Sequence, residues 1–437
     1  MDRRFCRLRV LILAASILFA TPVVSLAGSA TSRWDARLGG MVKFDYGYAT
    51  QAVGADADFA QRKSRLGAEN ALDETSNQFW AAGETRLNIL IKGPTAKGAK
   101  TSAFVEGDFR GQYSDSTYGN FNLRHAYMKL DWPKTSVVIG QTWQPWGIFP
   151  NLWLLKYDED GPYNRGIRIP QITVNQKLSR DFSIKGGITS PSTALGSEQG
   201  SNIVSSNTTS NWPDFAGELV WATDRYGRIG PWPFELAAGG LIGSRKVIYD
   251  RATGIVVPDQ ELFNPGGVPG GSFGNKSVTV WAVSLRGFVP IIPERGIGKR
   301  ANALGLVFAA FTGQYITNYA TLGTGIYNRD AAGRPVFIGP VVTGGWAQLM
   351  YYITDKLSIS GHASYSVSNM SVPLRRAQPN AVFKAERYVA NVVYDLNAAI
   401  RFGVEGSYVY TRYSAPFNGL ADWGSFYSAR FAAYYFF

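Results

Sequence analysis

The chain has 437 residues, of which 45% are apolar, 14% aromatic and only 17% charged, and its formal net charge is +12 at pH 7. Its single Cys and two His exclude a disulfide scaffold, a zinc cluster and a multihaem protein. Because charged residues are few and aromatic residues abundant, the composition also excludes an intrinsically disordered chain. The chain must therefore bury a large apolar surface or shield it with lipid.

The first residues have the pattern of a segment that directs export. Four arginines precede the apolar run 10–20, and small residues follow as far as Ala27 and Ala30. This arrangement predicts a signal peptide over residues 1–27, with cleavage after Ala27 or after Ala30, because the run is too short to span a bilayer. Cleavage removes Cys6 and lowers the net charge from +12 to +9, since four Arg and one Asp leave with the peptide.

From residue 34 onward, apolar and polar side chains alternate with a period of two. Between 34 and 48 the even positions carry apolar or aromatic residues and glycine, whereas Asp35, Arg37, Lys43 and Asp45 occupy odd positions. Successive side chains of an extended strand point to opposite faces, so such a segment is a strand with one apolar and one polar face. No stretch after residue 30 reaches the ~18 consecutive apolar residues of a membrane helix.

Sixteen segments of this kind follow one another to the C-terminus, and an even number is what a closed antiparallel barrel requires. The predicted strands are 34–48, 80–92, 100–112, 121–132, 135–145, 165–178, 180–190, 213–223, 232–246, 276–288, 302–316, 342–353, 356–368, 384–395, 398–412 and 424–437. Short connections lie at 133–134, 179–180, 354–355 and 395–397. Long connections lie at 49–79, 146–164, 191–212, 247–275 and 317–341. Alternation of short turns with long loops is typical of outer-membrane barrels.

A soluble β-sandwich also has strands with one apolar face, so the alternation alone does not separate it from a membrane barrel. Three features favour the barrel. The first strand, 15 residues long, exceeds the ~5–6 of a globular strand; the apolar face mixes Gly and Ala with aromatic residues, as in a lipid-facing band; and the chain ends on an alternating strand that finishes with Phe437. We therefore predict an all-β fold, a transmembrane antiparallel β-barrel of sixteen strands over residues 31–437.

Three short motifs resemble a known group of barrels. They are AFVEGDF at 103–109, LRHAY at 123–127 and GQTW at 140–143. With the C-terminal Phe, they resemble the phosphate-selective porin O/P and DcaP-like porins of Gram-negative bacteria. The resemblance implies a sixteen-stranded, homotrimeric outer-membrane porin whose third loop folds inward. The chain departs from the family in starting its first strand close to the cleavage site, without a helical extension, and in having no dense lysine cluster for a phosphate site.

The stretch 143–164 follows the fifth predicted strand and is the expected constriction loop. It contains Trp143, Trp146, Phe149 and Trp153, and it is too apolar to lie free in water. Folded into the lumen, it buries these rings against the barrel wall and presents its carboxylates to the channel. The alternative is an external loop that packs at the trimer interface or on the rim.

Carboxylates opposite arginines create a transverse field that sorts charged solutes, and this is the arrangement we expect at the constriction. The expected constriction residues are Asp158, Glu159, Asp160, Arg110, Arg124, Arg165, Arg168, Glu106 and Asp108. Strand parity places further charges of both signs in the lumen: Arg37, Lys43, Lys185, Arg245, Arg286, Arg387, Arg401, Arg430, Asp35, Asp45, Glu218, Glu235, Asp395 and Glu405. With Arg110, Glu106 and Asp108, which parity also places there, nine basic residues face eight acidic ones. For any single charge, a solvated wall position or wall salt bridge is the alternative. Parity is ambiguous between 121 and 178, where both faces are polar.

The function expected from these features is passive diffusion of small hydrophilic solutes, with a mild preference for anionic or zwitterionic ones. No cofactor, metal or enzymatic step is expected, and the expected partners are outer-membrane lipid, lipopolysaccharide and two further copies of the chain. A barrel enzyme would have to use His125 or His362, and a gated transporter would need a plug domain before the barrel. A barrel that sheathes a periplasmic multihaem cytochrome remains the main alternative, and a nucleic-acid binder lacks a basic stripe with interleaved aromatics.

Overall fold

The computed structural model describes most of the chain from residue 34 to the C-terminus. The described residues are 34–54, 57–65, 69–110, 120–147, 154–156, 167–191, 210, 212–251, 273–314, 322, 340–377 and 379–437. The chain divides into two units, Met1–Asp35 and Ala36–Phe437, and the barrel belongs to the second. The expected signal peptide lies outside the described residues.

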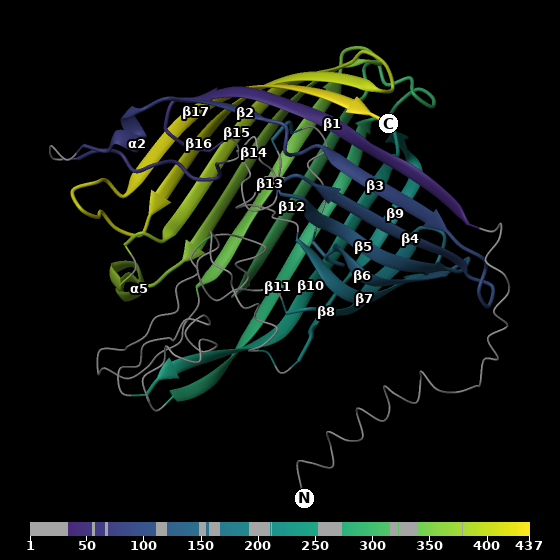
Figure 1. The fold of residues 1–437 in the computed structure, drawn as a ribbon, viewed down its shortest axis with the longest axis horizontal. Helices are drawn as coiled ribbons and strands as arrows, with labels where there is room; N and C mark the ends of the chain where they lie inside the picture. The colour runs from purple at the N-terminus through teal and green to yellow at the C-terminus, as the bar shows by residue number, and fades with distance from the viewer. Residues whose placement is uncertain are drawn as a thin grey trace, which may run out of the picture. The chain divides into compact units, whose positions relative to one another are not determined.

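An antiparallel β-sheet closes on itself in the second unit, with β1 beside β17 (Figure 1). From β3 to β17 each strand pairs with the next one in sequence, and β1 pairs with both β17 and β2. The strands are β1 (Asp35–Ala49), β2 (Asn77–Ala81), β3 (Arg86–Lys92), β4 (Lys100–Asp108), β5 (Asn122–Asp131), β6 (Thr135–Trp143), β7 (Arg168–Lys177), β8 (Phe182–Thr189), β9 (Asp214–Ile229), β10 (Trp232–Asp250), β11 (Phe273–Ile292), β12 (Leu304–Gln314), β13 (Val341–Tyr352), β14 (Leu357–Asn369), β15 (Val382–Asp395), β16 (Ile400–Tyr413) and β17 (Trp423–Phe436). The helices are α2 (Ala71–Glu74) and α5 (Val372–Ala377). Within the described ranges, no helix is long and apolar enough to cross a membrane.

The predicted sixteen-strand barrel is confirmed, with one correction in its second strand. The segment predicted as 80–92 is divided into β2 and β3, both of which pair with β1 and together fill one strand position. A turn separates them, in which Thr85 N donates to Ala82 O at 3.0 Å. The Thr85 hydroxyl accepts from Lys43 N at 3.2 Å, so a side chain replaces a ladder partner. A period-two pattern does not show such a break, because the residues on either side keep the same parity.

The outer surface of the barrel carries the apolar residues that the alternation assigned to lipid. Val404 on β16 is 57% exposed, and its cross-strand neighbours Val392 and Phe431 are also exposed. Leu285 on β11 and Ile242 on β10 are likewise exposed. An apolar band of this kind is unfavourable in water and stable against hydrocarbon, so the barrel is a transmembrane one.

Part of the inner wall is polar, as the alternation predicts. On β14 the hydroxyls of Ser360 and Ser364 are buried on either side of His362, whereas Ile359 and Tyr365 on the opposite face are exposed. His362 therefore lies on the inner wall. Its ring lies 5.6 Å from that of Trp346 on β13.

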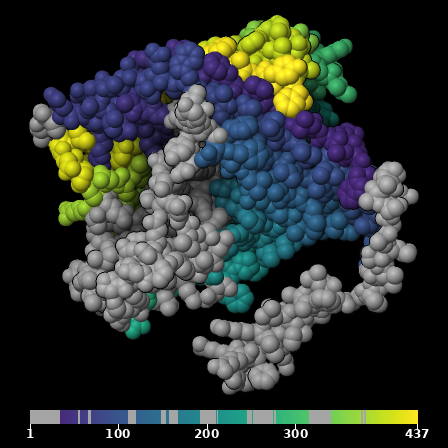
Figure 2. Space-filling view, in the orientation of Figure 1, coloured from purple at the N-terminus to yellow at the C-terminus, as the bar shows by residue number. Residues whose placement is uncertain are grey.

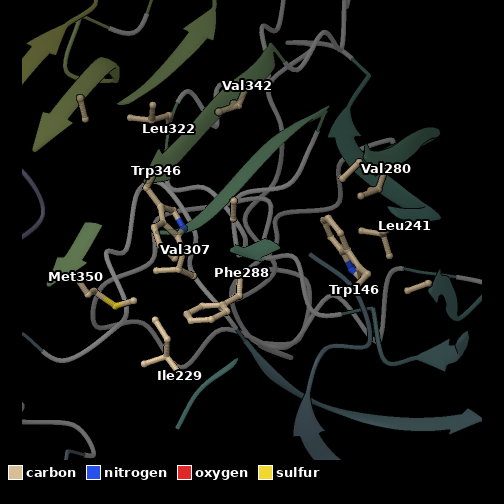
Figure 3. Close-up of a cluster of buried hydrophobic side chains, with 14 of the residues drawn as sticks. Trp146, Ile229, Leu241, Val280, Phe288, Val307, Leu322, Val342, Trp346 and Met350 are labelled. Carbon is tan, nitrogen blue, oxygen red and sulfur yellow. The ribbon is translucent and has the colours of Figure 1, made fainter. Parts of the chain in front are cut away.

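The remaining inner wall corrects the expectation of a lumen that is polar all round. The inner faces of β10 to β13 form one apolar cluster, in which Leu241, Val280, Val307 and Met350 are buried (Figure 3). Leu322, from the connection between β12 and β13, belongs to the same cluster and is 1% exposed. Apolar side chains are retained on an inner wall only where other parts of the chain cover them, so this half of the interior is packed and not open to solvent.

Val404→Arg tests the lipid-facing assignment of the outer surface. A cation placed on that face lowers the free energy of unfolding by ~2–4 kcal/mol near the bilayer midplane and by less toward its edges. We expect a loss within this range when unfolding by urea is followed in lipid vesicles, and little change for Val404→Leu at the same position. Equal stability of the two variants would contradict a lipid-facing position for Val404.

Candidate functional site

The long connection between β6 and β7 enters the barrel at two of its described parts. Gly147 N donates to Glu218 Oε2 on β9 at 3.2 Å, and Leu155 N donates to Glu405 Oε2 on β16 at 2.7 Å. Between these strands lie β10 to β15 on one side and β17, β1 and β2 to β8 on the other, so the contacts are on opposite walls. At these residues the predicted inward position of 143–164 is confirmed. We call this connection loop 3.

Trp146 anchors loop 3 to the apolar half of the interior. Its side chain is 2% exposed and lies against the inner faces of β10 and β11, near Leu241 and Val280 (Figure 3). The predicted burial of the loop aromatics is confirmed for Trp146, whereas Phe149 and Trp153 lie outside the described residues. The apolar wall and the apolar part of loop 3 therefore stabilise each other, because their contact removes both surfaces from water.

The far part of loop 3 is held on the opposite wall. Leu155 is buried against Val393 on β15 and Ala432 on β17. Its carbonyl oxygen accepts from Lys43 Nζ on β1 at 2.6 Å. Gly403 allows this approach, because a Cβ at that position would lie 2.7 Å from the Leu155 side chain. Loop 3 is thus joined to the wall by apolar contacts and by hydrogen bonds to charged groups.

Four of the predicted constriction residues lie together on β4, on β5 and just beyond β4. Arg124 is 2% exposed and donates from Nε to Glu106 at 2.8 Å and from a terminal nitrogen to Asp108 at 2.8 Å. Asp108 also accepts from the backbone N of Arg110 at 3.1 Å and from Asn122 at 3.2 Å. Two carboxylates of the wall therefore face one guanidinium, so these three side chains together add no positive charge to the lumen.

A β-bulge explains why strand parity was ambiguous here. His125 lies opposite Glu106 and Leu123 lies opposite Gly107, so Arg124 is the extra residue between two paired positions. A bulge gives two successive residues similar directions, and both Arg124 and His125 are buried while Leu123 is exposed. Sequence alternation assumes one residue per step and does not locate an inserted one.

Arg168 joins this group through two aromatic rings. Its guanidinium lies 4.5 Å from the ring centre of Trp143, and that ring lies 5.8 Å from His125. A cation over an indole ring is attracted by the ring quadrupole, which favours this position of Arg168. The other predicted constriction residues lie outside the described residues: Asp158, Glu159, Asp160 and Arg165.

A second charged group occupies the inner wall of β1 and β17. Lys43 is 1% exposed and forms ion pairs with Glu84 and, at 3.3 Å, with Asp45. Asp45 in turn pairs with Arg430 at 3.3 Å. Parity placed Lys43, Asp45 and Arg430 in the lumen, and their burial confirms it. The involvement of Glu84 was missed, since Glu84 lies in the turn that interrupts the second strand.

A third charged group lies on β8 to β11. Arg286 pairs with Glu218 and with Glu235, and Lys185 pairs with Glu218 at 3.0 Å. Glu218 also holds Gly147 of loop 3, as described above. These charges were assigned to the lumen by parity, but their pairing depends on strand register, which a single sequence does not reveal.

The connection between β1 and β2, here called loop 1, is bound to the neighbouring loops by Arg62. Its guanidinium donates to the carbonyl oxygens of Pro379 at 2.6 Å, Ala421 at 2.7 Å and Ala415 at 2.9 Å. It also lies 4.0 Å from the ring centre of Tyr413. Burial lowers the pKa of Arg62, but an arginine stays charged at neutral pH. Sequence reasoning treated 49–79 as an external loop and gave no sign of this anchor.

Neither a metal site in the described part of the chain nor a relative found by sequence helps to assign a function to these residues. Among the described residues, no group of three or more His, Cys, Asp or Glu side chains is arranged to hold a metal ion. No protein-family model matches the chain, and no curated protein is significantly similar to it in sequence.

The fold is shared with solved outer-membrane proteins. The outer-membrane channel DcaP of Acinetobacter baumannii is similar with a TM-score of 0.64 at 17% identity, over 93% of this chain and 99% of that one. OprB of Pseudomonas putida is similar with a TM-score of 0.51 at 11% identity, over 93% and 94%. OmpT of Vibrio cholerae, in its trimer form, is similar with a TM-score of 0.51 at 11% identity, over 93% and 100%. This chain has the fold of such channels. The resemblance of its short motifs to DcaP-like porins therefore agrees with a similarity of the fold.

Trp146→Ala tests the attachment of loop 3 to the inner wall. Removal of a buried Trp side chain costs ~3–5 kcal/mol in a protein core, so the loop should leave the wall. We expect trypsin to cleave faster after Lys156, whose side chain is 7% exposed in the native barrel, with the site mapped by mass spectrometry. Trp212→Ala, at a Trp that is 57% exposed, is the control. Equal cleavage rates in both variants would show that Trp146 does not hold the loop.

Proposed function

We propose that the chain is a porin of the bacterial outer membrane, which forms a water-filled channel for passive diffusion of small hydrophilic solutes. One observation carries the proposal: a closed sixteen-strand barrel, apolar outside, has a charged inner wall along which loop 3 contacts opposite sides. Barrels of ~16 strands are too wide for wall side chains alone to fill, and they leave an aqueous channel. Residues 1–27 are the signal peptide in this proposal.

Transport in this channel needs no chemical step. Solutes move down their gradients between loop 3 and the charged wall, and the channel selects them by width and by wall charge. Loop residues pack on the apolar part of the wall, on β10 to β13, so the path lies along the remaining wall, from β14 through β17 and β1 to β8. The described residues of this wall offer paired charges and hydrogen-bonding groups, which suit hydrated solutes.

A mild preference for anionic or zwitterionic solutes is part of the proposal. The net charge of +9 after removal of the signal peptide supports it, as do the arginines expected at the constriction: Arg110, Arg124, Arg165 and Arg168. The wall carboxylates on Arg124 and the loop carboxylates keep the preference mild: Glu106, Asp108, Asp158, Glu159 and Asp160. Charge of both signs across a narrow path also favours zwitterions, which match it on both sides.

We further propose a homotrimer, with outer-membrane lipid and lipopolysaccharide around it. A tilted strand needs ~9–11 residues to cross a bilayer. The strands β3 to β8 have 7 to 10 residues, at or just below this length, whereas β9, β10 and β11 have 16, 19 and 20. The short strands form one continuous wall, from blue to teal in Figure 2. A wall with so little margin is stabilised when other copies cover it, so this wall is the proposed contact between subunits.

Channel recordings in a planar bilayer test the function directly. We expect stepwise currents with a linear current–voltage relation at low voltage, and a reversal potential in a KCl gradient that shows slight anion preference. Absence of currents from folded protein would overturn the porin, and cation preference would overturn the proposed selectivity.

Arg124→Gln tests the role of the wall arginine. It leaves Glu106 and Asp108 without this counter-charge, so the reversal potential should shift toward cations, by ~1.5- to 3-fold in permeability ratio. Arg124→Lys should restore most of the wild-type value. Arg228→Gln, at an arginine whose side chain is 45% exposed at the end of β9, is the matched control. A shift of equal size in the control would remove Arg124 from the selectivity mechanism.

A further inference from the structure

Loop 1 places a carboxylate inside the barrel that no sequence pattern indicated. Asp58 forms ion pairs with Lys156 of loop 3 and, at 3.7 Å, with Arg387 on the inner wall of β15. The side chains of Lys156 and Arg387 are 7% and 3% exposed, whereas that of Asp58 is 18% exposed. One carboxylate therefore faces two buried cations, one from a loop and one from the wall.

The backbone around Asp58 is fixed by contacts on both sides. Arg387 donates to Ala57 O at 2.6 Å. Ala60 N donates to the Thr411 hydroxyl at 2.9 Å, and the Tyr413 hydroxyl donates to Ala60 O at 2.6 Å. With Arg62 anchored two residues further on, this part of loop 1 has little freedom to move its carboxylate. The position of Asp58 is thus built into the fold.

A close backbone approach supports the same placement. A Cβ at position 424 on β17 would lie 1.7 Å from the carbonyl oxygen of Gln61, so the path of loop 1 over this strand requires Gly424. Val53 and Ala60 of loop 1 pack with Val409 of β16 in a small apolar cluster. Loop 1 follows the inner side of β15 to β17 and does not extend freely into solvent there.

Asp58 lies beside a cavity whose lining is positively charged. The cavity is small, about 20 Å³, and lies between loop 1, loop 3 and the wall, where Lys156, Arg387, Arg430 and Glu405 line it. Glu405 already accepts from Leu155 N and, at 3.3 Å, from Asn391. The carboxylate of Asp58 is therefore the counter-charge that loop 1 supplies to a cavity with an excess of cations.

We propose that Asp58 is a selectivity-determining residue of the channel and that it occupies, from within the chain, a site on Lys156 and Arg387 for a small carboxylate. The proposal rests on the porin function. Opposite charges at ~4 Å interact strongly where water is partly excluded, so removal of the carboxylate changes the field of the cavity far more than removal of an exposed charge. The side chain of Asp58 is more exposed than those of its two partners, so its carboxylate is the part of this group that faces solvent.

Reversal potentials of variants test the selectivity. Asp58→Asn should raise the chloride-to-potassium permeability ratio by roughly twofold or more, since two cations lose this counter-charge. Asp58→Glu should stay close to wild type, and Lys156→Gln should shift the ratio the other way. Asp224→Asn, in an exposed ion pair with Arg228, is the matched control and should leave the ratio unchanged. An unchanged ratio in Asp58→Asn, with normal wild-type currents, overturns the proposal and leaves the porin function intact.

Acetate tests the site itself. In Asp58→Ala, acetate added to KCl should return the chloride-to-potassium ratio toward wild type in a saturable manner, because its carboxylate fits between Lys156 and Arg387. Wild-type channels and the Asp224→Asn control should show no saturable response. Folding of each variant is checked by the shift of its electrophoretic mobility on heating, so that a change caused by misfolding is not taken for a change in selectivity. A non-saturable response in Asp58→Ala equal to that of wild type overturns the site, whereas absence of any current from wild type overturns the porin function.

Discussion

A peptide group that meets hydrocarbon without a hydrogen-bond partner is strongly unfavourable, so a chain that crosses a membrane by strands has to close its sheet. Here the closure lies between β1 and β17, which are paired from Met41 and Phe436 to Ala49 and Ser428. The last residue extends it, because Phe437 and Gly40 exchange backbone hydrogen bonds at 3.2 and 3.1 Å. Closure leaves two faces, one toward lipid and one toward the interior, and every other feature of the barrel depends on that division.

The interior shows how a wide barrel manages space that its own wall does not fill. One half is apolar and covered, with Trp146 of loop 3 seated on β10 and β11. Ion pairs join wall to wall and loop to wall, both beside this region, as between Arg286 and Glu235, and on the rest of the wall, as between Lys43 and Glu84 and between Asp58 and Arg387. An isolated charge would be costly in this partly enclosed space, so the charges occur with partners. Loops and wall thus define the path for solutes together.

Much of the fold follows from period-two alternation, and the errors have local physical causes. The strand count and the lipid-facing residues such as Val404 were predictable, because a half-buried strand must alternate. The inserted Arg124 and the turn at Ala82–Thr85 were not, since both change the pairing without changing the composition. The apolar inner wall was also missed. We expected polar residues on the whole inner face, but this holds only where that face meets water and not where a loop covers it.

The amino-acid sequence by itself determined the closed barrel, its lipid-facing side and the alternation of short turns and long loops, because each depends on neighbouring residues. It favoured an inward loop 3 through the resemblance of short motifs, with an external loop as the alternative. Only the tertiary structure decided which charges meet. Asp58 and Arg387 lie far apart in sequence, and their contact depends on the closure of the barrel, the register of β15 and the path of loop 1 past Gly424. Such contacts form through long-range pairing, and no local pattern encodes them.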